Sequence, residues 1–451
     1  MPGFSQKTPI SLTLALPLAL AASTAAHAQT SPSPTATIPV SNCNNGGPGS
    51  LRAAVASAAS GDTIDLRSLE CRRVVLSTGA IQIPQNNLTL LGPTRAFTID
   101  GNRASQVLRH TGTGTLRLRA MTVANGNHEG RDAAGGCIGS AGDLRLEYTR
   151  VLDCRLSLGS GFEYGGAGIA AADDIALYDS QVSRNIAYDA FDDYYPHGGG
   201  IWAKGHLTLV RSLVSDNRAE GGQGGGIHAG GGLLVQQSEI SGNFAYVVGA
   251  MYASGDEITV ANSLIADNSA WSDYNALLYG SDTLVVNTTV SGNSAYRQSG
   301  LTFLGGSKSL LNSTIAANDE RGFHQLASCV GALSAQGSLH MESTIVARNT
   351  CGEHRVDITD NFDGASDPMQ IVGSDNLVMM STVALPSDTI SVNPRISPLA
   401  DNGGRTRTHA LWAGSPAVDM GNNNAGLEFD QRGPGFDRVN GTRADIGAYE
   451  R

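Results

Sequence analysis

A six-residue segment that ends in asparagine returns about every 25 residues through the middle of the chain. Its copies are residues 212–217, 238–243, 263–268, 288–293 and 313–318. The closing asparagines are 26, 25, 25 and 25 residues apart. A period of this length is typical of a solenoid, in which each repeat contacts only its neighbours. Function is therefore expected on a long, regular side wall and not in a closed pocket.

Within one period, apolar residues alternate with polar ones over three to five positions. In the period that closes at Asn217, the alternating residues are Ile201, Ala203, Leu207, Leu209, Ser212 and Val214. This is the periodicity of strands and not of helices. Three short strands per period make one coil of a parallel β-helix, whose strands stack about 4.8 Å apart. The sequence therefore predicts an all-β solenoid from about residue 62 to about residue 372.

The closing asparagines are expected to stack in a column at one corner of the coils. Asn185 and Asn349 extend the column at its two ends. Asparagine tolerates a left-handed backbone at turns, and stacked amides can hydrogen-bond along the axis. We interpret the column as structural.

Residues 1–28 have the pattern of a signal peptide. Lys7 precedes an apolar stretch at residues 10–22, and Ala26-His27-Ala28 matches a cleavage site before Gln29. No other segment is long and apolar enough to cross a bilayer. We expect a mature protein that is secreted, held at the cell surface or periplasmic, with no transmembrane segment.

The chain is acidic, with 30 basic and 41 acidic side chains and a net charge of −11. Removal of residues 1–28 takes away one lysine and leaves −12. This balance argues against a nucleic-acid partner and against an anionic polymer held by charge alone.

An even number of cysteines in an exported protein indicates disulfides. Cys137 and Cys329 each precede a strand-opening residue, whereas Cys154 and Cys351 lie in or near the asparagine column. These places flank one corner of a coil. The predicted pairs are Cys137–Cys154, Cys329–Cys351 and, by elimination, Cys43–Cys71. The spacings fit no zinc site, so no metal is expected among the cysteines.

The two ends of the chain differ from the repeats. Residues 29–42 are rich in Ser, Pro and Thr and predict a flexible lead-in. Residues 50–59 begin with a serine and contain good helix formers, which predicts a short capping helix.

The tail carries the blocks Asn402-Gly403-Gly404-Arg405, Gly414-Ser415-Pro416-Ala417, Asp430-Gln431-Arg432-Gly433 and Asp445-Ile446-Gly447-Ala448-Tyr449-Glu450. Over residues 373–450 it resembles the choice-of-anchor Q domain of exported bacterial right-handed β-helix proteins. Residues 49–54 resemble more loosely the Cys-Ser-Leu-Arg-Glu-Ala cap of many of these proteins. The resemblance implies a right-handed β-helix and export, but no particular activity. A surface anchor usually follows the module in that family, and here the chain stops at Arg451, so we expect a soluble exported protein.

The predicted organisation is a signal peptide at 1–28, a lead-in and N-terminal cap at 29–61, the parallel β-helix at 62–372 and a C-terminal module at 373–451. Polar residues of the module invite assignment as a site: His409, Asp419, Asp430, Arg432 and Asp445. We interpret them as turn residues and structural ion pairs.

Two rows of aromatic residues flank the corner after the asparagine column. The first row contains Tyr188, Tyr246, Trp271 and Tyr296, each three residues past an asparagine. The second row contains Trp202, His228 and Tyr252, which should point outward by alternation. Aromatic faces along a wall suit the C–H faces of sugar rings, although the same residues can also pack under loops.

An insertion at residues 186–197 adds acidic residues beside these rows. Asp192 and Asp193 are candidates for a general acid and base or for Ca²⁺ ligands, and Ca²⁺ is the one cofactor considered. Lys204 and His228 are candidate bases for lyase chemistry. Two hypotheses remain: an exported protein that binds a polysaccharide or cell-surface glycan along its wall, or a polysaccharide lyase or glycoside hydrolase that acts in an aromatic groove.

Overall fold

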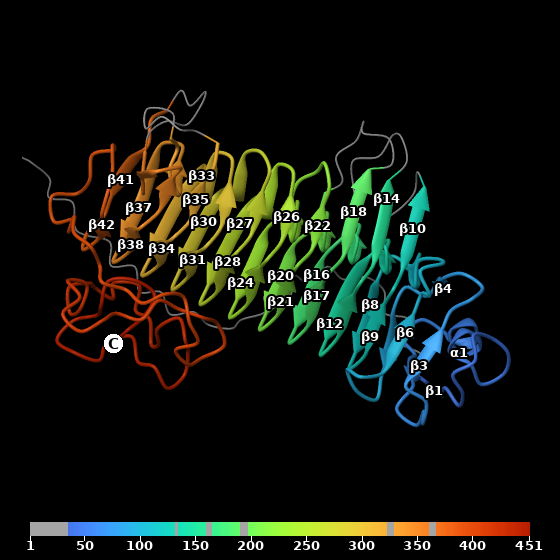
Figure 1. The fold of residues 1–451 in the computed structure, drawn as a ribbon. Coiled ribbons are helices and arrows are strands. Elements are labelled where there is room, and N and C mark those ends of the chain that lie inside the picture. The colour runs from blue at the N-terminus through green and yellow to red at the C-terminus, as the bar shows by residue number, and fades with distance from the viewer. Residues whose placement is uncertain (1–34, 131–133, 159–164, 190–196, 323–328, 360–366) are drawn as a thin grey trace, which may run out of the picture.

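The chain winds into a parallel β-helix with three faces to each regular coil (Figure 1). The computed structural model describes residues 35–130, 134–158, 165–189, 197–322, 329–359 and 367–451. Strands stack into a 20-stranded sheet A, a 12-stranded sheet B and a 10-stranded sheet C. Among the described residues, all pairings between the strands of these sheets are parallel except one short hairpin in sheet C. The predicted all-β solenoid is confirmed.

Sheet A receives two strands from most coils, and in three coils these fuse into one long strand. Sheet A consists of β1 (Thr37–Pro39), β2 (Thr63–Asp65), β4 (Ile81–Ile83), β5 (Leu88–Leu91), β7 (Leu108–His110), β8 (Thr115–Arg119), β11 (Ile138–Ser140), β12 (Asp143–Glu147), β15 (Ile169–Ala171), β16 (Ile175–Tyr178), β19 (Ile201–Ala203), β20 (Leu207–Val210), β23 (Ile227–Ala229), β24 (Leu233–Gln236), β27 (Val248–Ala261), β30 (Tyr274–Val286), β33 (Gln298–Leu311), β36 (Leu333–Ala335), β37 (Ser338–Glu342) and β41 (Gln370–Val372).

Sheet B receives one short strand from each coil, and sheet C begins later, at β10, and ends in the hairpin β39–β40. Sheet B consists of β3 (Arg73–Val75), β6 (Thr98–Asp100), β9 (Thr122–Ala124), β13 (Arg150–Leu152), β17 (Gln181–Ser183), β21 (Leu213–Ser215), β25 (Glu239–Ser241), β28 (Leu264–Ala266), β31 (Thr289–Ser291), β34 (Thr314–Ala316), β38 (Ile345–Ala347) and β42 (Leu377–Val378). Sheet C consists of β10 (Asn127–Gly130), β14 (Arg155–Leu158), β18 (Ile186–Asp189), β22 (Arg218–Ala219), β26 (Phe244–Ala245), β29 (Ser269–Ala270), β32 (Ser294–Ala295), β35 (Asp319–Glu320), β39 (Thr350–Cys351) and β40 (His354–Arg355).

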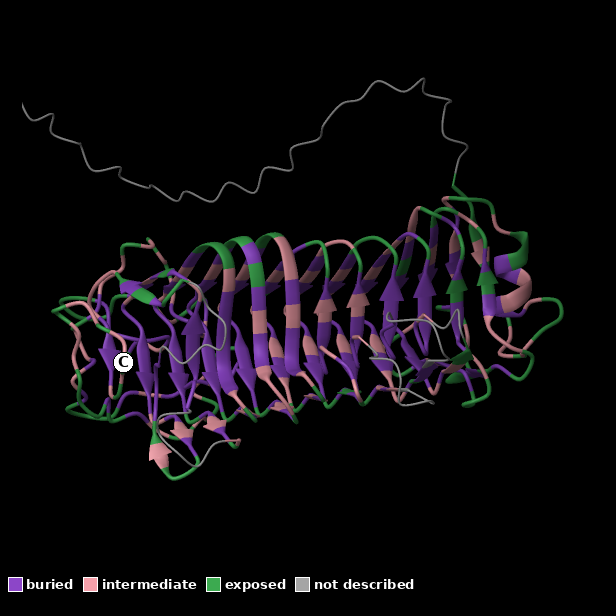
Figure 2. Cartoon of the chain, turned by 90° about the horizontal axis from the view of Figure 1, so that it is seen from above, coloured by how far each residue is buried: buried purple, intermediate pink, exposed green. Residues whose placement is uncertain are grey.

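The register stacks like residues above one another inside the solenoid. Ile201 pairs with Ile227, which pairs with Met251, and all three are fully buried. Burial of such apolar ladders stabilises each coil against the next, by about 25 cal/mol per Å² of apolar surface. A slip of one residue would exchange the inward and outward faces, so alternation fixes the register. Figure 2 shows buried strands lying side by side along the length of the molecule, each across its long axis.

The repeated asparagines form a continuous buried ladder. Asn243 Oδ1 accepts from both the backbone N and Nδ2 of Asn217, each at 3.0 Å. Asn243 Nδ2 donates in turn to Val214 O at 3.0 Å and to Asn268 Oδ1 at 2.9 Å. The rungs of the ladder are Asn185, Asn217, Asn243, Asn268, Asn293, Asn318 and Asn349. The expected column therefore exists, and its buried polar atoms are satisfied.

The left-handed turn beside the ladder lies one residue earlier than expected. Positive φ is found at the residues that precede the rungs, with 55° at Asp216, 57° at Asp267 and 66° at Gly242. The asparagines themselves do not adopt this conformation. The expectation that the asparagines adopt a left-handed backbone conformation was wrong. Their side chains form the hydrogen bonds of the ladder, and the preceding residue adopts the left-handed conformation of the turn.

Both ends of the apolar core are covered. Helix α1 (Leu51–Ser57) begins at Ser50, whose side chain accepts from Ala53 N, and buries Leu51, Ala54 and Val55. At the opposite end Val383 and Leu385 pack against the same core. This covering limits strand pairing with another chain. Within the described residues, no helix is long and apolar enough to cross a membrane.

The C-terminal residues fold back along the solenoid and pack on the outside of sheet B (Figure 1). Gly447 N donates to Ser343 O at 2.8 Å, and Ala448 N donates to Thr314 Oγ1 at 3.0 Å. One buried apolar cluster joins the two parts and contains Ala316, Ile345, Ala347, Leu377, Ile396, Leu411, Ala417 and Ile446. The tail is thus docked on a side face by backbone bonds and apolar burial together.

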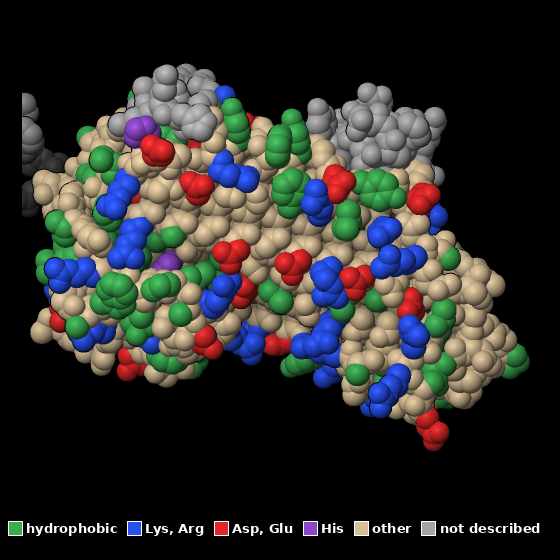
Figure 3. All heavy atoms as spheres, in the orientation of Figure 1, with side chains coloured by type: hydrophobic (Ala, Val, Ile, Leu, Met, Phe, Trp, Pro, Cys, Tyr) green, Lys and Arg blue, Asp and Glu red, His purple; other side chains and the backbone are tan. Residues whose placement is uncertain are grey.

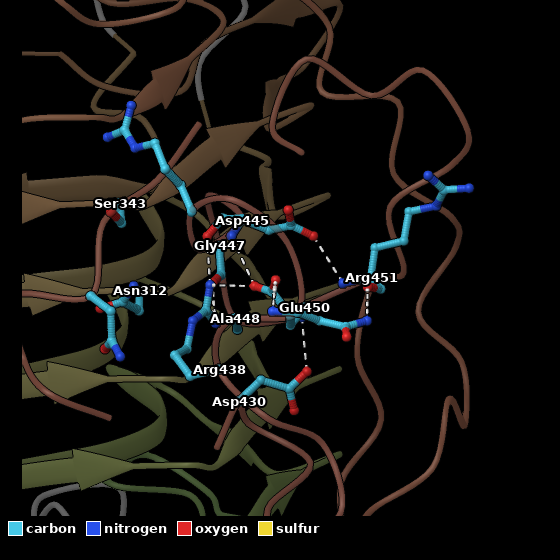
Figure 4. A network of polar contacts seen from close by, with 12 residues as sticks. Asn312, Ser343, Asp430, Arg438, Asp445, Gly447, Ala448, Glu450 and Arg451 are labelled. Atoms are coloured by element: carbon cyan, nitrogen blue, oxygen red, sulfur yellow. Dashed lines mark hydrogen bonds and ion pairs between the residues drawn. The ribbon is translucent and has the colours of Figure 1, made fainter. Parts of the chain in front are cut away.

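Buried ion pairs hold this tail together (Figure 4). Arg438 is fully buried, donates to Gly447 O at 3.0 Å and lies 3.6 Å from Glu450 Oε2. Arg432 pairs with Asp430 at 2.6 Å. His409 is buried with Nε2 2.9 Å from Ser291 Oγ, and burial lowers its pKa. These contacts agree with the interpretation of the charged residues of the tail as structural.

The six cysteines form three disulfides: Cys43–Cys71, Cys137–Cys154 and Cys329–Cys351. Two of these, Cys137–Cys154 and Cys329–Cys351, are the pairs that the coil alignment predicts, and Cys43–Cys71 is the pair predicted by elimination. Their Cα atoms are 6.4, 5.5 and 6.0 Å apart, within the reach of a disulfide.

Candidate functional site

Three exposed aromatic side chains stand at the corner where sheet C leads into sheet A. Tyr246, Trp271 and Tyr296 directly follow β26, β29 and β32, and expose 43%, 65% and 47% of their surface. Coils stack about 4.8 Å apart, so the three residues form one row, here called the aromatic row. Hydrophobic side chains are seen along the upper edge of the molecule, above sheet C (Figure 3). Because equivalent strands stack in register, the row has one ring per coil along the wall.

Charged side chains beside the aromatic row are held in place by contacts of their own. Arg218 Nε lies 2.6 Å from Glu220 Oε1, and its guanidinium carbon lies 4.5 Å from the centre of the Phe244 ring. Arg321 donates to Ser269 Oγ at 3.0 Å and to Ala270 O at 2.8 Å. Fixed donors and acceptors beside exposed rings are suited to a ligand that has both apolar faces and hydroxyl groups.

The second predicted row is partly covered. Trp202, His228 and Tyr252 are register partners on the outward side of sheet A, and all three are half-buried. The His228 ring stacks on Tyr252 at 4.7 Å and lies 4.6 Å from the ring of His197. These rings contact one another, so they leave less area for a ligand than the aromatic row does.

The environment of His228 argues against a role as general base. Burial lowers the pKa of His228 to about 3, with a smaller effect from His197. An imidazole with so low a pKa is neutral at physiological pH and a weak proton acceptor. Lys204 is exposed in the turn after β19, and within the described residues neither Lys204 nor His228 forms an ion pair with a carboxylate.

Of the remaining predicted residues, the structure describes only Tyr188. Tyr188 is half-buried on β18, two coils before Tyr246. Asp192 and Asp193 lie outside the described residues, so the structure does not test them. The described corner therefore contains exposed rings and paired charges, without a described pair of catalytic carboxylates.

A polar hollow that the sequence did not reveal lies on sheet A near the C-terminal coils. Its volume is about 590 Å³, and Lys308, Ser309, Gln336, His340 and Asp367 are among the residues that line it. Lys308 is buried, donates to Gly306 O at 2.7 Å and has its pKa lowered by burial. Lys308 occupies an inward place that Ile258 fills two coils earlier and Thr283 one coil earlier, and a lysine at such a place is the signal that could have found it.

One group of carboxylates could hold a metal ion. Asp143, Asp173 and Asp174 place their oxygens within 4.8 Å of one another on adjacent turns of sheet A. Asp173 and Asp174 are exposed, and acidic groups in such turns commonly remain solvated charges. They are not among the residues predicted as Ca²⁺ ligands.

The comparisons with known proteins do not identify a family for this chain, so the fold is established by the register of its strands. No family model matches the chain, and no curated protein matches its sequence. Among solved structures, the crystal structure of pectate lyase Pel9A is similar over 93% of this chain and 97% of that one, with 14% identity and a TM-score of 0.44. We draw no functional conclusion from a likeness of this degree.

Proposed function

We propose that this is an exported β-helix protein that binds a polysaccharide along its side wall. The observation that carries the proposal is the aromatic row, in which Tyr246, Trp271 and Tyr296 are exposed at one repeating position of consecutive coils. Flat rings contact the apolar faces of sugars, and fixed polar groups beside them supply hydrogen bonds. A stacked wall is already ordered before binding, which lowers the entropic cost of association.

Affinity electrophoresis through gels that contain hydroxyethyl cellulose, xyloglucan, galactomannan or mixed-linkage β-glucan tests the proposal. The double variant Tyr246→Ala/Trp271→Ala removes two exposed rings, each of which contributes about 1 kcal/mol by analogy with aromatic pairs. We expect about 30-fold weaker binding to whichever polymer retards the wild type, with an unchanged melting temperature because the rings lie outside the core.

The matched control is Tyr279→Ala/Trp412→Ala, which removes two other exposed rings from sheet A and from the tail. Its affinity should equal that of the wild type. Equal weakening in both double variants, or wild-type affinity in the first, would place the site elsewhere. A large drop in melting temperature in the first would mean that its rings are packing residues.

Export is part of the proposal and rests on the signal-peptide pattern of residues 1–28 and on the resemblance of the tail to exported modules. We propose cleavage after Ala28. Intact mass measurement of protein secreted from a bacterial host tests it, since cleavage predicts a chain that begins at Gln29. A secreted chain that retains residues 1–28 would contradict it.

A second candidate function is cleavage of a polysaccharide by elimination or hydrolysis. One observation favours it, at a place other than the aromatic row: Lys308 lines the polar hollow with His340 and Asp367, and burial lowers its pKa. A lysine with a lowered pKa is better able to act as a base. Release of reducing ends or unsaturated products by the wild type, lost in Lys308→Gln but retained in Lys204→Gln, would support cleavage at this hollow. Absence of both products on neutral and acidic polymers would leave binding as the function.

A further inference from the structure

Arginines gather on the outward side of sheet A in the coils near the N-terminus. Arg117 and Arg119 lie on β8, and their register partners on β12 are Arg145 and Glu147. The three arginine side chains are 45%, 54% and 37% exposed in the order Arg117, Arg119 and Arg145. Register thus sets two arginines directly opposite each other, an arrangement that is unfavourable without an opposing charge.

The carboxylate of Glu147 forms ion pairs with all three arginines. Glu147 Oε1 lies 2.6 Å from Arg145 Nε and 3.7 Å from Arg117 Nε, while Oε2 lies 3.9 Å from Arg119 Nε. Only the contact with Arg145 is a hydrogen bond. In the part of the chain that the structure describes, the side chains of Arg117 and Arg119 form no hydrogen bond and no ion pair other than those with Glu147. Three arginines and one glutamate leave two positive charges in excess.

Aromatic rings hold neighbouring guanidinium groups in place. The guanidinium carbon of Arg145 lies 4.5 Å from the centre of the Tyr178 ring. At the adjoining corner that of Arg95 lies 5.5 Å from the centre of the Tyr148 ring. Cation–π contacts of this kind restrict a guanidinium group while its edge N–H groups still point away from the ring. We call Arg95, Arg117, Arg119 and Arg145 the arginine face.

The arginine face belongs to a basic segment, about a quarter of an otherwise acidic chain. Residues 35–155 contain 13 basic and 9 acidic side chains, a balance of +4. Residues 156–378 contain 9 basic and 24 acidic side chains, a balance of −15. The net charge of the whole chain argued against an anionic polymer, but charge is distributed so unevenly that the argument does not hold for this face.

We propose that the arginine face binds an acidic polysaccharide through carboxylate or sulfate groups. Guanidinium groups bind both in a bidentate manner. Arg117 and Arg145 stand on coils that are about 4.8 Å apart, so closely spaced anionic groups of a polymer chain can contact both. A long nucleic-acid duplex fits less well, because the rest of the wall is strongly acidic and would repel its phosphates. This site is separate from the aromatic row.

Three polymers with one backbone test the proposal: dextran, carboxymethyl-dextran and dextran sulfate, in affinity electrophoresis at about 50 mM and about 200 mM salt. We expect the wild type to be retarded by at least one charged dextran, less so at the higher salt, and not by dextran itself. The relative retardation by carboxymethyl-dextran and by dextran sulfate distinguishes recognition of carboxylate groups from recognition of sulfate groups. Arg117→Gln/Arg119→Gln should weaken this binding about tenfold or more.

The control variant Arg355→Gln/Arg451→Gln removes the same charge from two exposed positions far from the arginine face in the chain. It should bind within about twofold of the wild type, and melting temperatures should match. Tyr246→Ala/Trp271→Ala should leave binding of the charged dextrans unchanged, which separates this site from the proposed neutral one. No retardation by either charged polymer, equal binding by both arginine variants, or tighter binding of duplex DNA than of the charged dextrans would each overturn the proposal.

Discussion

Asp357 occupies the last rung of the asparagine ladder and accepts hydrogen bonds at both side-chain oxygens. Its Oδ1 accepts from Asn349 N at 3.0 Å and Asn349 Nδ2 at 2.8 Å, and its Oδ2 accepts from Met380 N at 2.9 Å. An asparagine here would turn its Nδ2 toward the N–H of Met380. Aspartate therefore suits the end of the ladder, although burial raises its pKa to about 6.

Replacement of Asp357 by alanine leaves three N–H groups without their acceptor. We expect a loss of about 2–4 kcal/mol in the free energy of unfolding, since buried unsatisfied donors are costly. Glu353→Ala in the exposed turn nearby is the control and should change stability by less than about 0.5 kcal/mol. Urea unfolding curves measure both, and equal midpoints for the two variants would contradict the role of Asp357.

Glu320 is a second buried acid, placed where the preceding coils have alanine. Ala295 is its register partner, and its carboxyl accepts from Val330 N at 3.0 Å and Gly331 N at 2.8 Å. Burial raises the pKa of Glu320 to about 8, well above the value of an unfolded chain. The stability that this group contributes is therefore present below about pH 4.5 and is lost as the pH rises toward about 8.

Glu320→Gln keeps the shape of the side chain and removes its titration. We expect the variant to gain stability relative to the wild type by about 2–5 kcal/mol between pH 5 and pH 8, because only the wild type must bury a charge as the pH rises. Melting temperatures over this pH range provide the measurement. Parallel pH profiles for the two proteins would show that Glu320 does not titrate in this way.

Among the elements, the asparagine ladder links each coil to the next at the corner between sheets B and C. Asn268→Ala removes the acceptor of Asn243 N and Asn243 Nδ2, at 2.9 Å each, from the middle of the ladder. We expect a cost of about 2–5 kcal/mol, more than for the outward-facing Gln236→Ala one coil away. Urea midpoints compare the two, and similar losses would mean that the ladder adds little to stability.

The strands were predictable because every coil repeats the same local pattern. Alternation places Ile201 inward and Trp202 outward from neighbouring residues alone. The dock of the tail on sheet B was not predictable, since it depends on contacts such as that of His409 with Ser291, 118 residues apart. At the corner, the position of the aromatic row followed from the period, but the burial of His228 depends on His197 and Tyr252 and could not be read from either residue.

At the scale of the whole molecule, the tail and the solenoid share one interface. Arg438→Met leaves Glu450 and the carbonyl of Gly447 without their partner inside this interface. We expect a loss of about 3–5 kcal/mol that loosens the tail first, as for other broken buried pairs. Hydrogen exchange should become faster at Gly447 and Ala448 while amides of the asparagine ladder stay protected.

The control for this prediction is Arg443→Met, which breaks a partly exposed pair with Asp375. It should change exchange at Gly447 little, because exposed ion pairs contribute at most about 1 kcal/mol. Faster exchange along the ladder in Arg438→Met would mean that tail and solenoid unfold as one unit.

The amide groups of the ladder all point in one direction, and this sets how the protein can grow. From Asn185 to Asn349 every Nδ2 donates toward the C-terminal neighbour, so each interior rung is both donor and acceptor. A duplicated period that is inserted between two such rungs finds the same side-chain donor on one side and the same acceptor on the other as the original period. Among the described residues, the side-chain series ends at Asp357, whose Oδ2 accepts from the backbone N of Met380. The solenoid can therefore lengthen by duplication between interior rungs without interrupting the ladder.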